Sequence, residues 1–123
     1  MEEFCRINRW EMLKKQLKNL KPTEFLAMKK EHPKAILIDC RVPIEFKTGY
    51  LEGAQNMDYF GEEFYDQLEN LDSNAIYLVY CRSGRRSLRT CTLMQNSGFL
   101  QVYNLDGGLK AWFEELGTEG MTN

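Results

Sequence analysis

The chain has 123 residues, of which 43% are hydrophobic and 28% charged, and its formal net charge is −2. These values are typical of one globular domain with a single core, and they exclude a globally basic surface for nucleic acid. No apolar run approaches the roughly 18 residues of a membrane span, and the acidic N-terminus does not resemble a signal peptide. We therefore expect a cytoplasmic protein that binds neither nucleic acid nor a membrane.

Short apolar runs alternate with helical patterns along the chain. The runs that favour strands cover residues 17–20, 34–39, 54–57, 75–80 and 101–104. The helical patterns between and after them cover residues 22–31, 43–47, 62–71, 85–97 and 108–116. This alternation predicts an α/β fold, with a mainly parallel central sheet of about five strands and helices on both faces.

The alternating pattern also sets the expected domain limits. Residues 17–116 would form one domain, residues 1–16 an N-terminal extension without assigned structure, and residues 117–123 a C-terminal tail. Neither end has the repeats or the low-complexity composition of a linker.

The most informative segment is residues 81–87, with the sequence CRSGRRS, between the strand predicted for 75–80 and the helix predicted for 85–97. A cysteine at such a turn faces the unpaired N–H groups of the first helical turn, which favour a thiolate over a thiol. Arginines there oppose the helix dipole, so their presence suggests a task such as anion binding. The segment predicts that Cys81 is a nucleophile and that the substrate contacts Arg82, Ser83, Gly84, Arg85, Arg86 and Ser87.

The other cysteines suggest no metal centre or disulfide framework. Cys5, Cys40 and Cys91 lack zinc-ligand spacing, and the sequence holds a single histidine, His32. We expect buried positions for Cys40 and Cys91, with a resolving thiol as the less favoured alternative. We expect no metal and no organic cofactor.

A second cluster of charge follows the strand predicted for residues 34–39. If that strand lies beside the strand at 75–80, Arg41 and Cys81 open on the same side of the sheet, where such folds bind ligands. We interpret Asp39, Arg41 and Glu45 as structural supports of this region and not as catalysts.

Several segments, taken in order, resemble the rhodanese-like domain family, most closely its small single-domain sulfurtransferases. The resemblance covers roughly residues 17–116 and rests on residues 38–41, 45–46, 49–56, 80–87, 98–99, 102–105, 107–108 and Trp112. It implies that Cys81 accepts a sulfur atom from a donor such as thiosulfate or a persulfide. The resulting Cys81 persulfide would pass that sulfur to cyanide or a thiol, with a protein as a further possible acceptor.

Alternatives remain open from the residues alone. Cysteine phosphatases, and arsenate reductases of similar chemistry, use a Cys-x5-Arg loop, whereas here Arg86 is the fifth residue after Cys81 and Ser87 the sixth. The shorter loop should suit a sulfur atom better than a tetrahedral oxyanion. A persulfide carrier without turnover, an interaction module of the same fold, and a buried structural thiol are the other readings.

Overall fold

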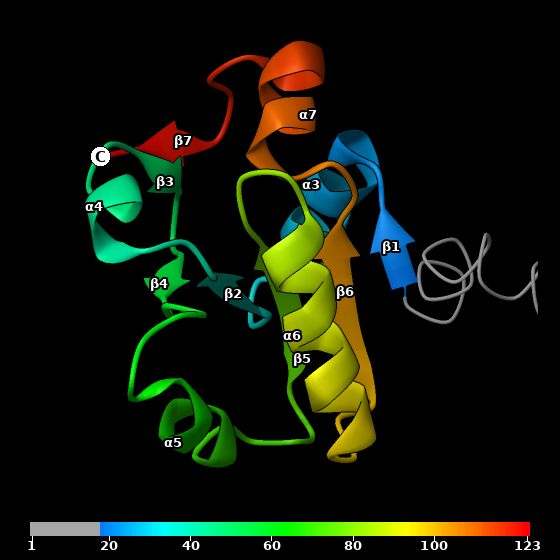
Figure 1. Ribbon diagram of the computed structural model, residues 1–123. Helices are drawn as coiled ribbons and strands as arrows, with labels where there is room; N and C mark the ends of the chain where they lie inside the picture. The colour runs from blue at the N-terminus through cyan, green and yellow to red at the C-terminus, as the bar shows by residue number, and fades with distance from the viewer. Residues whose placement is uncertain (1–17) are drawn as a thin grey trace, which may run out of the picture.

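The computed structural model describes residues 18–123, which fold around a five-stranded sheet of order β1-β6-β5-β2-β4 (Figure 1). Every pairing within this sheet is parallel. Its strands are β1 (Lys18–Leu20), β2 (Ile36–Asp39), β4 (Gln55–Asn56), β5 (Ile76–Tyr80) and β6 (Gln101–Leu105). The predicted α/β class and parallel sheet are therefore confirmed. Cys5 and the extension predicted for residues 1–16 lie outside the described residues.

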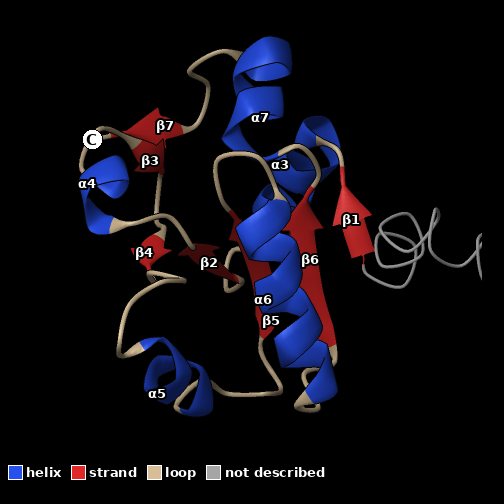
Figure 2. Cartoon of the chain, in the orientation of Figure 1, coloured by secondary structure: helices blue, strands red, loops and turns tan. Residues whose placement is uncertain are grey.

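Helices cover both faces of the sheet, as predicted (Figure 2). They are α3 (Pro22–Glu31), α4 (Pro43–Phe46), α5 (Phe64–Glu69), α6 (Arg85–Asn96) and α7 (Gly108–Leu116). The apolar side chains of α5 and α6 pack in one core cluster, and those of α3 and α7 pack in another. Helix α5 is shorter than the predicted 62–71, because Leu71 continues only as a turn through its N–H bond to the carbonyl oxygen of Leu68.

The central strand explains why its sequence is apolar at every position. Tyr77 and Val79 point into the cluster beneath α5 and α6, while Leu78 and Tyr80 point into the cluster beneath α3 and α7. All four side chains are fully buried. A parallel strand covered on both faces has no solvent side, so it shows a continuous apolar run and not an alternating one.

A second, two-stranded sheet was not predicted. In it, β3 (Tyr50–Leu51) pairs antiparallel with β7 (Met121–Thr122), beside α4. Two-residue strands carry no periodicity, so no pattern in the sequence indicated them. The side chain of Trp112 supports the pairing, because its Nε1–H donates to the carbonyl oxygen of Glu119, just before β7, at 2.8 Å.

The first turn of α7 is docked on the segment that follows β5. The N–H of Leu109 donates to the carbonyl oxygen of Cys81 at 2.9 Å, and the N–H of Lys110 donates to that of Arg82 at 3.0 Å. Gly108 makes this approach possible: a Cβ there would lie 2.5 Å from the carbonyl oxygen of Arg82. Its φ of +62° is also one that other residues adopt with strain.

Substituting Gly108 therefore tests how closely α7 is packed on this segment. We expect Gly108→Ala to lose about 1–2 kcal/mol of unfolding free energy from the left-handed backbone and roughly 1–3 kcal/mol more from the clash. Gly117→Ala is the matched control, because Gly117 has a φ of +60° but nothing within 4 Å of an added Cβ. Urea denaturation measures both variants, and equal losses would contradict the close packing.

Candidate active site

Cys81 lies where β5 ends, at the carboxyl edge of the sheet, and the chain turns there into α6 (Figure 1). Strand β2 is the hydrogen-bonded neighbour of β5, with Asp39 in register with Tyr80. The two chain segments singled out in the sequence, which begin after Asp39 and after Tyr80, therefore leave the sheet side by side.

Three donors converge on the Cys81 sulfur. The N–H of Gly84 lies 3.1 Å from Sγ, the hydroxyl of Ser87 3.3 Å, and the N–H of Ser87 3.4 Å. The loop can curl in this way because Gly84, which precedes α6, has a φ of +93°. The thiol is fully buried. An anionic sulfur here would find hydrogen-bond donors in place of water.

The arginines of the loop occupy different environments. Arg82, Arg85 and Arg89 have exposed side chains, whereas Arg86 is partly buried. Arg86 forms an ion pair with Glu45, with Nη1 3.0 Å from Oε1, and its Cζ lies 5.9 Å from the centre of the Phe60 ring. This hydrogen bond to Arg86 lowers the pKa of Glu45. Glu45, on α4, thus contacts the Cys81 loop through Arg86, and it also interacts electrostatically with Arg41.

Asp39 and Arg41 form a separate, buried ion pair. Nη2 of Arg41 lies 2.8 Å from Oδ2 of Asp39 and also donates to the carbonyl oxygen of Gly49 at 2.6 Å. The backbone N–H of Arg41 donates to Oδ1 of Asp39 at 2.8 Å. These bonds join the end of β2 to the turn after α4. Helix α4 itself contains Glu45, which contacts the Cys81 loop.

The remaining described thiols do not share the donors of Cys81. Cys40 and Cys91 are fully buried, and burial raises the pKa of each. Cys40 Sγ lies 3.4 Å from Oγ1 of Thr90, and that hydroxyl donates to the carbonyl oxygen of Arg86. Buried, protonated thiols are weak nucleophiles, so the arrangement favours packing over a resolving role. Within residues 18–123 we find no group of three side chains suited to a metal ion.

An open cleft of about 580 Å³ lies beside the loop, and the sequence did not indicate it. Its lining combines residues of α4 and α7 with Arg82: Arg41, Ile44, Glu45, Thr48, Arg82, Leu109, Lys110 and Phe113. Residues on two short helices far apart in the sequence form it, so only the fold brings them together.

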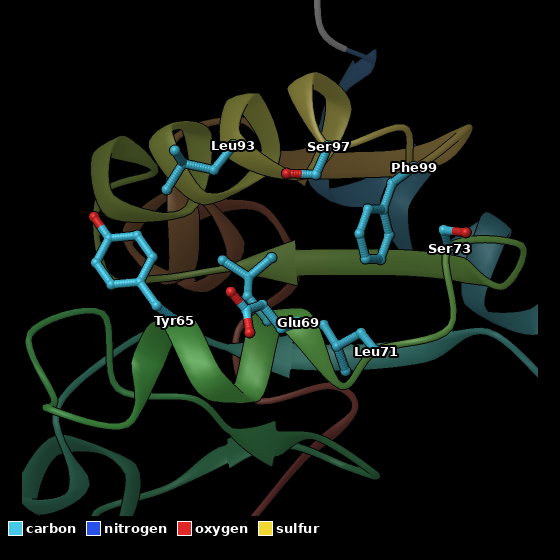
Figure 3. Close-up of a pocket in the computed structure, with 8 residues that line it drawn as sticks. Tyr65, Glu69, Leu71, Ser73, Leu93, Ser97 and Phe99 are labelled. Carbon is cyan, nitrogen blue, oxygen red and sulfur yellow. The ribbon is translucent and has the colours of Figure 1, made fainter.

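A second cavity, of about 430 Å³, lies between α5 and α6 (Figure 3). Its lining includes Tyr65, Glu69, Leu93 and Phe99 but no cation and no cysteine. It therefore has nothing to attract an anionic sulfur compound.

Among the described helices, none has the length and apolar character needed to cross a membrane.

The two ion pairs predict losses of stability that differ in size. Asp39 is fully buried, so Asp39→Ala leaves the charge of Arg41 unpaired in the interior and should cost roughly 3–5 kcal/mol of unfolding free energy. Glu45→Ala breaks the more exposed pair with Arg86 and should cost about 1 kcal/mol or less. Urea denaturation at neutral pH measures both, and similar losses would show that the Asp39–Arg41 pair is not a structural support.

Comparison with known proteins gives the family of this chain. The family model described as the rhodanese-like domain matches residues 21–115. A thiosulfate sulfurtransferase GlpE of Pseudomonas putida is 31% identical over 97 residues, which cover 79% of this chain and 86% of that protein. The uncharacterized protein YqhL of Bacillus subtilis is 32% identical over 96 residues, covering 78% and 72% respectively.

Solved structures show the same architecture. A rhodanese-like domain protein from Staphylococcus aureus superposes with a TM-score of 0.67 at 27% identity, covering 78% of this chain and 91% of that one. The polysulfide-sulfur transferase of Wolinella succinogenes gives a TM-score of 0.72 at 25% identity, covering 90% and 84%. By its sequence and by its fold, this chain belongs to the rhodanese-like domain family.

Proposed function

We propose that this protein is a sulfurtransferase that carries a sulfur atom on Cys81. The observation that carries the proposal is the convergence of three donors, from Gly84 and Ser87, on the Cys81 sulfur. The names of the related proteins, a thiosulfate sulfurtransferase and a polysulfide-sulfur transferase, support a donor that bears a sulfur–sulfur bond.

The first step would load the cysteine. With thiosulfate as donor, the Cys81 thiolate attacks the outer sulfur and forms a new S–S bond. The bond between the two sulfur atoms of thiosulfate breaks, and its electron pair leaves with sulfite. The product is a Cys81 persulfide anion, and atoms and charge balance without an external oxidant. The rate of such a step depends on the thiolate fraction and on the leaving group.

The second step would remove the sulfur from Cys81. A nucleophile such as cyanide or a thiol attacks the outer sulfur of the persulfide, and the electron pair of the broken S–S bond returns to Cys81 as the thiolate. Both steps proceed without a metal or an organic cofactor, because every charge that moves is held on sulfur or on the departing anion.

The other site residues have supporting roles in this proposal. Arg82 and Arg85, exposed at the start of the loop, would attract the anionic donor together with Ser83, and Arg86 would neutralise charge near the sulfur. Glu45 positions Arg86, and the Asp39–Arg41 pair holds the neighbouring turn. A phosphatase loop would need an arginine at the sixth residue after Cys81. That residue is Ser87, whose hydroxyl donates to Sγ.

Replacing the cysteine tests the proposal directly. After incubation with thiosulfate and removal of the excess, intact mass should increase by one sulfur atom in the wild-type protein and not in Cys81→Ser. Thiosulfate:cyanide activity should also vanish in Cys81→Ser. A wild-type mass that does not change, with no activity above that of the variant, would contradict sulfur transfer. Loading without turnover on cyanide would instead identify a persulfide carrier.

The donor set gives a second prediction. Ser87→Ala removes the hydroxyl donor to Sγ and should slow loading by thiosulfate about 10- to 100-fold, as the loss of one hydrogen bond to a charged group does. Thr92→Ala is the matched control, because that α6 hydroxyl donates to the carbonyl oxygen of Leu88 and not to the site. Quenched-flow mass spectrometry gives both rates, and equal rates would show that the hydroxyl does not act on the sulfur.

A further inference from the structure

We infer that the cleft between α4 and α7 is an acceptor site for a small thiol that carries two anionic groups. This inference rests on the proposed sulfur transfer and adds the acceptor class. The cleft volume of about 580 Å³ lies within the range of small-molecule sites and is far larger than cyanide requires.

Uncompensated positive charge lines the cleft. Arg41 and Glu45 also face it, but they are paired with Asp39 and Arg86 respectively. Arg82 and Lys110 are exposed, and neither has an ion-pair partner within residues 18–123. The surface there is therefore positive although the whole chain is negative. Two carboxylates or phosphates on one ligand would complement these two cations.

The cleft also presents an apolar wall. Ile44 is 76% exposed and Phe113 47% exposed, and Leu109 lies at the base of α7 beside them. Exposed apolar side chains that line a concave site can bury the apolar part of a ligand. They suit the aliphatic stem of a thiol, whereas cyanide and sulfite would leave them uncovered.

The lining of the cleft meets the Cys81 loop at three points. Arg82 is the residue after Cys81, and Glu45, which also lines the cleft, accepts a hydrogen bond from Arg86. Leu109, in the lining, donates its N–H to the carbonyl oxygen of Cys81. A thiol whose anionic groups contact Arg82 and Lys110 would thus hold its sulfur close to the loop that carries the persulfide.

Transfer of the sulfur to such an acceptor forms one S–S bond and breaks another. The thiol sulfur bonds to the outer sulfur of the Cys81 persulfide anion, and the bond from that sulfur to Sγ breaks. The electron pair of the broken bond stays on Sγ as the thiolate. The thiol proton ends on the outer sulfur, so the products are a free persulfide and the Cys81 thiolate.

The first experiment measures binding without sulfur chemistry. S-methyl mercaptosuccinate, a dicarboxylate that cannot accept sulfur, is titrated into the ¹⁵N-labelled protein, and amide shifts are followed by NMR. We expect saturable shifts in residues 109–113 and a dissociation constant about tenfold higher for Lys110→Glu. Lys30→Glu, which makes the same charge change at an exposed position of α3, should bind as the wild type does. Absence of saturable shifts in the cleft, or equal weakening in both variants, would overturn the inference.

The second experiment measures transfer from the loaded protein. We expect Lys110→Glu to slow transfer to subsaturating mercaptosuccinate about tenfold, and to leave both transfer to the neutral thiol 2-mercaptoethanol and loading by thiosulfate within about twofold of wild type. An unchanged ratio of the two transfer rates would refute the acceptor site alone. Failure of the wild type to load refutes the proposed function, and the binding titration still decides whether the cleft holds a dianion.

Discussion

The docking of α7 on the carbonyl groups of Cys81 and Arg82 is the contact on which the site depends. Those two carbonyl oxygens accept the N–H groups of Leu109 and Lys110. Further along the same loop, the N–H groups of Gly84 and Ser87 face the sulfur. Gly108 permits the approach, because any side chain there would meet the same carbonyl oxygens. A helix near the end of the chain thus anchors the start of the Cys81 loop through two backbone hydrogen bonds.

Two ion pairs at the carboxyl edge of the sheet differ in how deeply they are buried. The Asp39–Arg41 pair lies in the interior, where loss of either partner would leave an unpaired charge. The Arg86–Glu45 pair is more exposed, and water weakens it. The first pair therefore holds the backbone, while breaking the second costs less free energy.

The three described cysteines also differ in the groups that surround their sulfur atoms. Cys81 meets three donors, whereas Cys40 and Cys91 lie among apolar side chains that raise the pKa of each. Burial alone does not separate them, since all three sulfur atoms are fully buried. The distinction comes from the backbone N–H groups at the start of α6, which face Cys81 because it ends the strand that leads into that helix.

Patterns local to the sequence predicted the parallel sheet, the helices on both faces and the loop at residues 81–87. Local propensity and apolar runs specify these, because a strand buried on both faces and the glycine turn before a helix leave strong local patterns. Three features were not predictable in this way and come from the folded chain: Glu45 pairs with Arg86, β3 and β7 form a sheet, and Ile44 and Lys110 share a cleft. These contacts join residues far apart in the chain, and their geometry depends on how α4 and α7 pack at the sheet edge, which no local pattern encodes.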